Sequence, residues 1–193
     1  MRQEPERKYT LEEYWKLVET FPDRKYEYAD GYIRMMTGGS VPHGEIAMNI
    51  GAALHAALRH SACHVYNSDV AVELFGQKCY YPDISVSCDP DDWARKKALE
   101  SPTVVVEVLS PSTEGTDRIE KLKAYKRYPT IQEILLVDAR KCYAEHYHRL
   151  NAYKWEESAY ESMDDVIDLT SIQVQLIVQD IYLKVSLELE GSE

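Results

Sequence analysis

Two helices are predicted in the first third of the chain from their capping and apolar residues. Thr10 and Glu13 have the spacing of a capping box, which predicts a helix that ends near Thr20. Ser40 can cap a second helix up to about His60, in which an apolar residue recurs every four positions, at Ile46, Ile50, Leu54 and Leu58. Between the helices, an Asp-Gly pair predicts a tight hairpin that joins strands at 25–28 and 32–36.

Further runs of β-branched and apolar residues predict strands at 64–75, 79–88, 103–109, 131–138 and 142–149. A helical pattern at 114–127 separates the third run from the fourth, and Pro129 prevents its continuation. In the C-terminal part, segments 172–178 and 181–189 alternate like strands. The order of these segments indicates a mixed α/β sheet whose central pair is 79–88 and 103–109.

An acid interrupts the most apolar of these predicted strands. The sequence VVVEVL at 104–109 is apolar on both alternating faces, which is typical of a strand covered from two sides. An ionised Glu107 without a partner would cost on the order of several kcal/mol there. Glu107 must therefore be protonated, paired with a core arginine or lysine, or bound to a metal ion.

A second acid lies in the neighbouring predicted strand. In 79–88, Ile84 and Val86 point to one face and Asp83 to the other. If Asp83 and Glu107 lie side by side, their repulsion holds a proton on one of them unless a cation is present. A divalent ion removes this penalty, and oxygen ligands favour Mg²⁺ or Mn²⁺ over zinc. Taken alone, Asp83 could instead accept backbone hydrogen bonds where the strand begins.

The predicted helix at 114–127 adds a cation. Asp117, Lys121 and Tyr125 are spaced four residues apart, hence on one helix face. We expect Lys121 to point toward the acids, where it would orient or deprotonate a water molecule or stabilise charge on a phosphoryl oxygen. We expect its removal to affect rate far more than folding. A lysine on a helix is, however, more often a solvated surface residue.

Length and composition limit the possible classes of protein. With 193 residues, 45% hydrophobic and 28% charged, the chain is long enough for one domain with a sizeable core and too apolar to be disordered. We expect a single domain over 1–193, with its core at about 9–155 and an acidic extension of the same domain at 156–193. The charged N-terminal segment lacks the apolar stretch of a signal peptide, and no apolar run reaches the roughly 20 residues of a membrane helix. We therefore expect a cytoplasmic protein.

The cysteines predict no special chemistry. Cys63, Cys79, Cys88 and Cys142 are scattered without a CxxC pair. Neither a zinc knuckle nor a disulfide framework is predicted, so we expect buried or incidental thiols.

The net charge of −11 argues only weakly against a polyanionic partner, because the charge is unevenly distributed. Residues 155–193 carry ten acids and one base, so the first 154 residues have a net charge of only −2. Within them, residues 114–154 carry nine bases and six acids, a net charge of +3. This segment could face a phosphate backbone.

Six short segments occur in an order that is harder to obtain by chance than any one of them. They are YTLEEY at 9–14, YEYADG at 26–31, Pro82-Asp83, VVVEVLSPST at 104–113, DRIEKL at 117–122 and ILLVD at 134–138. Together with Tyr125, and with His43 after a Ser-Pro-type turn, they resemble the Uma-type restriction endonuclease family of the PD-(D/E)XK superfamily. The resemblance covers about residues 9–155.

The resemblance implies a restriction-endonuclease-like fold, in which helices flank a mixed β-sheet, and a metal-dependent activity on DNA. It implies that Asp83 and Glu107 bind the metal ion together with the carbonyl of Val108. It also implies that Lys121 is the catalytic lysine and that Glu27 is an additional acid near the site. The usual superfamily motif places its lysine two residues after the glutamate, where this chain has a leucine, whereas the Uma-type pattern has it in the next helix.

Simpler roles remain open for three other residues or pairs. Glu27 precedes a hairpin turn and could be an exposed cross-strand partner of a basic residue. His43, early in a helix, is more often a surface or capping residue than a base. His146 and His148 share a strand face, but no third metal ligand is evident.

The leading functional hypothesis is a Mg²⁺- or Mn²⁺-dependent endonuclease that hydrolyses DNA phosphodiester bonds. Cutting both strands of a duplex requires two related sites, which favours a homodimer. Two other hypotheses stay open: a catalytically weak nucleic-acid-binding or regulatory domain with this fold, and a metal-independent acid-pair hydrolase such as a glycosidase. The divalent-ion dependence of cleavage would distinguish all three.

Overall fold

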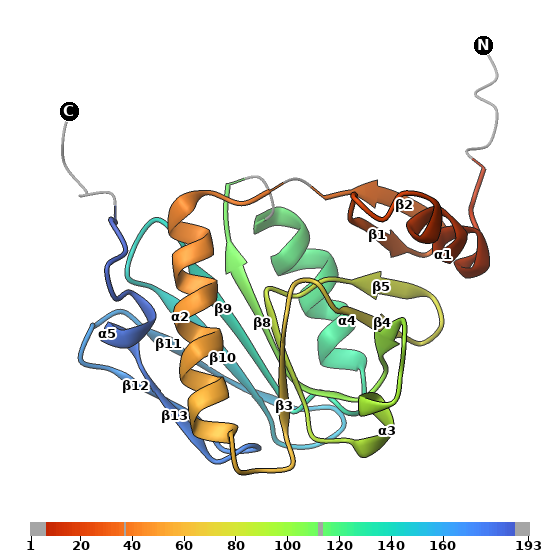
Figure 1. The fold of residues 1–193 in the computed structure, drawn as a ribbon. Helices are drawn as coiled ribbons and strands as arrows, with labels where there is room; N and C mark the ends of the chain where they lie inside the picture. Colours follow the sequence, from red (N-terminus) through yellow and green to blue (C-terminus); the bar gives the residue numbers. More distant parts are fainter. Residues whose placement is uncertain (1–6, 37, 112–113, 188–193) are drawn as a thin grey trace.

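The computed structural model describes residues 7–36, 38–111 and 114–187. Figure 1 shows the arrangement of its elements. The first half contains α1 (Leu11–Thr20), β1 (Tyr26–Ala29), β2 (Tyr32–Met35), α2 (Val41–Leu58), β3 (His64–Asn67), β4 (Ala71–Leu74), β5 (Lys78–Tyr80), β6 (Ile84–Ser87) and α3 (Pro90–Trp93). The second half contains β7 (Ala98–Leu99), β8 (Pro102–Leu109), the π-helical segment η1 (Thr116–Lys121), α4 (Leu122–Arg127), β9 (Glu133–Asp138), β10 (Ala144–Arg149), β11 (Trp155–Tyr160), β12 (Val166–Leu169), β13 (Val174–Ile177) and α5 (Val178–Ile181). Within the described ranges, no helix is both long and apolar enough to cross a membrane.

The main sheet has six strands in the order β11-β10-β9-β8-β6-β3. Strands β8 and β9 are parallel, and the helical segment of η1 and α4 connects them, whereas β6 pairs with β8 in the antiparallel sense. The predicted mixed sheet, with 79–88 and 103–109 as neighbours, is therefore confirmed. The five-stranded second sheet has the order β2-β1-β5-β4-β7.

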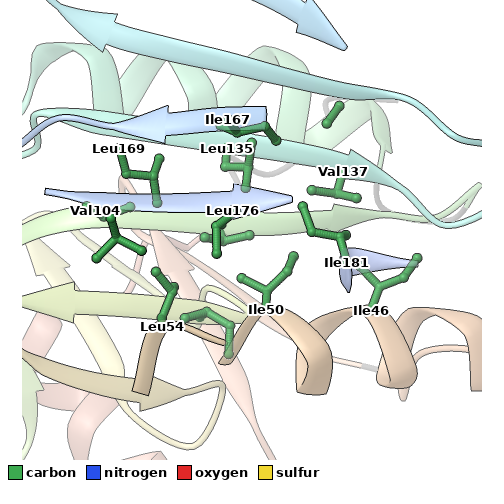
Figure 2. Packing of buried hydrophobic residues seen from close by; sticks show 14 of the residues in the cluster. Ile46, Ile50, Leu54, Val104, Leu135, Val137, Ile167, Leu169, Leu176 and Ile181 are labelled. Atoms are coloured by element: carbon green, nitrogen blue, oxygen red, sulfur yellow. The ribbon is translucent and has the colours of Figure 1, made fainter. Parts of the chain in front are cut away.

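Alternate residues of β8 pack into two different hydrophobic clusters, one on each face of the main sheet. Val104, Val106 and Val108 contact the cluster that contains α2. Figure 2 shows this side, where Ile46, Ile50 and Leu54 of α2 lie near Val104, Leu135 and Val137 of the sheet and near Ile167, Leu169, Leu176 and Ile181 of the C-terminal part. Val105 and Leu109 belong to the cluster on the other face, with Tyr125 of α4 and residues of the second sheet. Both faces of β8 are thus covered, as its continuous apolar sequence predicts.

The start of the chain confirms the predicted helix, hairpin and helix. Thr10 and Glu13 form the capping box of α1, and Ser40 caps α2. The hairpin turn between β1 and β2 has positive φ angles at Asp30 (52°) and Gly31 (99°). Each feature depends on neighbouring residues in the sequence, which is why local patterns predict it.

The two long strands predicted at 64–75 and 79–88 are each broken in two. Asn67 accepts a hydrogen bond from the Asp69 amide and turns the chain after β3. Pro82, which has no N–H group, separates β5 from β6. As a result β3 and β6 join the main sheet, whereas β4 and β5 join the second sheet.

The C-terminal prediction is partly wrong. Strand β13 lies within the predicted 172–178, but its antiparallel partner β12 and strand β11, which pairs with β10, were not expected. The segment predicted as a strand at 181–189 begins in α5 and continues without strand pairing to residue 187; residues 188 and 189 lie outside the described residues. The side chain of Asn49 donates hydrogen bonds to the carbonyls of Ile181 and Leu183, so a contact with α2 replaces a strand ladder.

A tight turn between β4 and β5 places a bulky residue in the left-handed region. Phe75 has φ 57° and Gly76 has φ 64°, and the Gln77 amide donates to the Leu74 carbonyl across the turn. A side chain with a Cβ atom costs roughly 1–2 kcal/mol in this conformation, which glycine or asparagine adopts more readily. The Phe75 side chain is nevertheless half exposed, at 50%.

The prediction that the cysteines are thiols is wrong for one pair. Cys63 and Cys88 form a disulfide. The cause is the antiparallel pairing of β3 with β6, in which His64 lies opposite Ser87. Cys63 precedes His64 and Cys88 follows Ser87, so the two cysteines also lie opposite each other, with their Cα atoms 4.0 Å apart. The other two cysteines are free, and Cys79 is buried as expected.

Candidate active site

The two predicted metal-binding acids lie opposite each other at the carboxyl end of β8. Ile84 of β6 pairs with Val106 of β8, and continuing this antiparallel register by one residue places Asp83 opposite Glu107. The Oδ2 atom of Asp83 accepts a hydrogen bond of 2.7 Å from the backbone N–H of Val108. The register thus brings together the three residues predicted to bind metal.

Glu107 is almost completely buried, with 3% of its surface exposed. Its Oε1 atom accepts a 2.6 Å hydrogen bond from the hydroxyl of Tyr125 and lies 3.3 Å from Nζ of Lys121. Both partners come from the helical segment after β8, so the crossover to β9 covers the acid. The same oxygen receives both contacts, which fixes the orientation of the carboxylate.

Lys121 is also buried, with 4% exposed, and three carboxylates surround its ammonium group. Its Nζ atom lies 2.8 Å from Glu27, 3.2 Å from Asp117 and 3.3 Å from Glu107. The sequence correctly predicted that Lys121 points toward the acids. We revise the expectation that removing Lys121 affects rate far more than folding, because the loss of its ammonium would leave buried carboxylates without their cation.

The backbone around Lys121 departs from an ordinary α-helix. Residues of η1 are π-helical, and the Leu122 amide bonds to the carbonyl of Asp117, five residues earlier. Such wide turns occur frequently at functional sites. Here the wide turn carries both Asp117 and Lys121, whose side chains are buried on the same side.

Glu27 joins this cluster from the second sheet. It is buried on β1 and is the register partner of Arg34 on β2, so the cross-strand pairing considered for it exists. However, the guanidinium of Arg34 is 4.0 Å from Glu27 and makes two shorter hydrogen bonds to Glu120. Lys121 is therefore the closer cation, and Glu27 lies inside the site.

His43 and Asp117 are site residues that sequence reasoning did not assign. The Nε2 atom of His43 lies 3.3 Å from Oδ2 of Asp83, and the hydrogen bond with Asp83 raises the pKa of the imidazole. Its ring packs so closely against Gly39 that a Cβ there would lie 2.6 Å from Nδ1. Two features of the sequence could have identified these residues: the position of His43 in the first turn of a predicted helix, and the helix face that Asp117 shares with Lys121.

The cluster has more negative than positive charge. Burial raises the pKa of the Glu107 carboxyl well above its ordinary value; Lys121 opposes this shift, whereas the neighbouring carboxylates of Asp117, Asp83 and Glu27 reinforce it. Burial alone would lower the pKa of Lys121, but the carboxylates raise it well above its ordinary value. The lysine therefore stays charged, and a further cation would relieve the repulsion among the acids.

The geometry of the site suits a divalent ion with several water ligands. Asp83, Glu107, Val108 and Lys121 line a pocket of about 440 Å³. The contacts described above engage Oδ2 of Asp83 and Oε1 of Glu107, and none of these contacts involves the second oxygen of either carboxylate. Within the described part of the chain, no three Asp, Glu, His or Cys side chains form a ready-made metal cage. Two carboxylates, one carbonyl and water form the kind of ligand set that Mg²⁺ prefers.

The histidine pair on β10 belongs to a different cluster. His146 and His148 both lie within 3.5 Å of Glu133, a completely buried acid at the start of β9. Burial would raise the pKa of Glu133, but the adjacent His146 and the hydrogen bonds from the Ser171 amide and Thr170 hold it below its ordinary value. No pattern in the sequence predicts that Glu133 joins the two histidines, because the contact depends on strand register.

The basic segment at 114–154 does not form one continuous phosphate-binding surface. Arg118 pairs with Glu114 and Glu145, and Arg140 pairs with Glu114 and Asp138. The net charge of +3 is therefore partly neutralised inside the fold, which the linear charge count could not reveal.

Comparisons with known proteins agree with this arrangement. A family model described as "Putative restriction endonuclease", Uma2, matches residues 11–181. The chain belongs to the Uma2 family. Two uncharacterised proteins of Synechocystis sp. are similar to it: one is 36% identical over 82% of this chain and 83% of its own length, the other 29% identical over 68% and 76%.

A solved structure has the same fold as this Uma2 chain. A crystal structure from Anabaena variabilis, described as a "putative nuclease belonging to DUF820", matches with a TM-score of 0.69 and 22% sequence identity. The match covers 90% of this chain and 97% of the other. The predicted nuclease-like fold, a mixed sheet flanked by helices, is confirmed.

Proposed function

We propose that this Uma2 protein is a divalent-metal-dependent endonuclease that hydrolyses phosphodiester bonds of DNA. The observation that carries the proposal is the buried Glu107 opposite Asp83, in a cluster where the buried carboxylates of Glu27, Glu107 and Asp117 share the single ammonium group of Lys121. Such an excess of buried negative charge is costly for a structural cluster and useful in a metal site. Membership of a nuclease family favours a nucleic-acid substrate.

In this proposal Asp83, Glu107 and the Val108 carbonyl hold Mg²⁺ or Mn²⁺. The bound ion supplies positive charge beside the phosphate and acidifies the attacking water. The Val108 amide and the Tyr125 hydroxyl orient the two carboxylates through the hydrogen bonds described above. The ligands are thereby positioned before an ion arrives, which reduces the reorganisation that binding requires.

In the proposed mechanism Lys121 acts on the water or the phosphate, and Glu27 positions Lys121. The water oxygen attacks phosphorus in line as the opposite P–O bond breaks, and charge grows on the phosphoryl oxygens. The ammonium of Lys121, held 2.8 Å from Glu27, is placed to orient the water or to stabilise that charge. Glu27 keeps Lys121 protonated and directed into the pocket.

The proposal includes a homodimer in the cytoplasm, where DNA is available. Two-fold symmetry would place one site on each strand of a duplex. Light scattering at micromolar concentration tests the dimer, and a monomeric mass would contradict it. The Cys63–Cys88 disulfide would be rare in a reducing cytoplasm, so its redox state in cells tests this location.

The decisive experiment for activity is cleavage of supercoiled plasmid and single-stranded DNA by purified protein with Mg²⁺, Mn²⁺ or EDTA. Metal-dependent cleavage that Glu107→Gln abolishes would support the proposal. Cleavage in EDTA would indicate a metal-independent acid pair instead. DNA binding without cleavage under all conditions would indicate a binding or regulatory domain.

A further inference from the structure

A larger pocket, of about 610 Å³, lies on the opposite side of the helical segment from Lys121. One wall is the outer face of this segment, where Ile119, Lys123 and Arg127 are spaced four residues apart. The other wall is the β4–β5 turn with Phe75. The catalytic pocket and this second pocket share no lining residue.

Positive charge is available in this pocket although the protein as a whole is acidic, with a net charge of −11. Its two acidic lining residues are already paired: Asp30 bonds to Lys78, and Glu120 makes two hydrogen bonds to Arg34. In contrast, Lys123 and Arg127 are exposed, and neither has a carboxylate partner among the residues that the structure describes. The pocket therefore complements an anionic ligand.

The aromatic wall of the pocket is held in an unfavourable backbone conformation. Phe75 has φ 57°, yet half of its side chain is exposed, so burial does not explain an aromatic residue in the turn. Its ring is held edge-on against Tyr128, with centroids 4.9 Å apart. Ile119 across the pocket is 74% exposed. The turn thus presents a fixed ring and an apolar neighbour beside two free cations.

We propose that this pocket binds an unpaired segment of DNA outside the catalytic site. Lys123 and Arg127 contact phosphates, and a base stacks on Phe75 with Ile119 beside it. Aromatic rings and cations are the two features that proteins combine to bind single strands without reading their sequence. The proposal rests on the proposed function in taking DNA as the substrate, and it adds a separate anchoring site that duplex cleavage alone does not require.

Binding of a fluorescein-labelled single-stranded oligonucleotide, followed by anisotropy in EDTA, tests this site without cleavage. Phe75→Gly suits the positive φ and removes the ring, so the fold should be retained while binding weakens about tenfold. Phe75→Asn, which also tolerates this φ, provides a second variant with the same expected loss. An oligonucleotide with abasic positions should bind wild type more weakly and should not respond to Phe75→Gly.

Charge variants test the phosphate contacts. In Lys123→Ala/Arg127→Ala, the slope of log Kd against log salt should fall by about 0.7 for each lost contact. Lys154→Ala, an exposed cation in another turn, is the matched control and should bind like wild type. With cleavable DNA and metal, the pocket variants should raise KM and leave kcat nearly unchanged.

Two results with the variants would overturn the inference, and one result with the wild type would do the same. One is unchanged affinity in the Phe75 variants and the double charge variant. The other is a dimer, seen by light scattering, that Phe75→Gly dissociates, since the pocket would then be covered by a second copy. If wild type binds no oligonucleotide, the inference also fails, whereas metal-dependent plasmid cleavage decides separately whether the proposed nuclease function stands.

Discussion

Two buried glutamates on the neighbouring parallel strands β8 and β9 have opposite electrostatic environments. Glu133, at the start of β9, accepts hydrogen bonds from the Ser171 amide and from Thr170, and two histidines lie beside it. Its pKa is lowered, because these contacts outweigh the effect of burial. Glu107, near the end of β8, shares one lysine with other acids, and its pKa is raised. Both residues are almost inaccessible to solvent, and the hydrogen-bond donors and cations around them differ.

The polar groups at the two ends of the β8–β9 pair therefore have different roles: those at one end stabilise the fold, and those at the other form the candidate metal site. At the amino end of β8, buried Asp92 accepts hydrogen bonds from Ser87 and from the amides of Glu100 and Ser101, and a disulfide joins Cys63 to Cys88 nearby in the chain. These groups all have bonding partners within the fold and stabilise it. At the carboxyl end, Glu107, Glu27 and Asp117 share one buried lysine. In α/β sheets, ligands bind at the carboxyl ends of parallel strands, and the uncompensated charge lies there.

The largest expected difference between the two glutamates is in catalysis. Glu107→Gln should lower metal-dependent DNA cleavage about 10²- to 10⁴-fold, the scale of a lost charge-stabilising group. Its unfolding free energy without metal should equal or exceed that of wild type, because a neutral amide needs no cation. Glu133→Gln should show the reverse: normal cleavage per folded molecule and a loss of about 1–3 kcal/mol in stability. Plasmid cleavage measures the activity of the two variants, and urea unfolding measures their stability. If the same variant were the more impaired in both assays, the predicted contrast between the two glutamates would be wrong.

Removing the shared cation should expose the charge imbalance as instability. Lys121→Ala should cost about 3–5 kcal/mol of unfolding free energy, since Glu27, Glu107 and Asp117 would remain buried without it. Adding Glu107→Gln to Lys121→Ala should recover part of this loss. A double-mutant cycle by urea unfolding measures the coupling. Strictly additive effects would show that the two groups do not interact.

Loss of the disulfide should affect only the amino end of β8. Cys63 and Cys88 enclose a loop with a sequence separation of 25, so reduction should lower the unfolding free energy by about 3 kcal/mol. Metal-dependent cleavage should stay the same, because the pair lies away from the pocket residues. Urea unfolding and plasmid cleavage with and without dithiothreitol test this. A loss of cleavage in reduced, folded protein would show that the two ends are coupled.

The smallest expected effect is a pH dependence at Glu133. Because its folded-state pKa is below the ordinary value of 4.5, its contribution to stability is present above that pH. This contribution should be lost as the pH falls through the lowered folded-state pKa. Wild type and Glu133→Gln should therefore become closer in stability below about pH 4.5. A stability difference that grows on acidification would contradict the sign of the shift.

The sequence predicted those features of the site that depend on one strand or one helix. The acid inside VVVEVL and the helix face of Asp117 and Lys121 were visible from periodicity alone. The pairing of Asp83 with Glu107 required only that two strands be neighbours, and the register confirms it. Glu27 was suggested by family resemblance, because its strand lies in a different sheet.

What the sequence did not predict depends on contacts between distant segments. His43 reaches Asp83 only because α2 begins beside the carboxyl end of β8, and the disulfide forms only because β3 pairs with β6. The prediction of a strand at 181–189 was wrong because hydrogen bonds from the Asn49 side chain replace strand pairing at the start of this segment. Pairing partners of this kind leave no periodic pattern in the sequence.

Calorimetric titration of Mn²⁺ into the metal-free protein tests the central claim most directly. Wild type and Glu133→Gln should bind the ion with micromolar to millimolar affinity. Asp83→Asn and Glu107→Gln should bind it at least about tenfold more weakly, because each removes a charged ligand. Unchanged binding in both of these variants, or a loss confined to Glu133→Gln, would contradict the assignment of the metal site to the carboxyl end of β8.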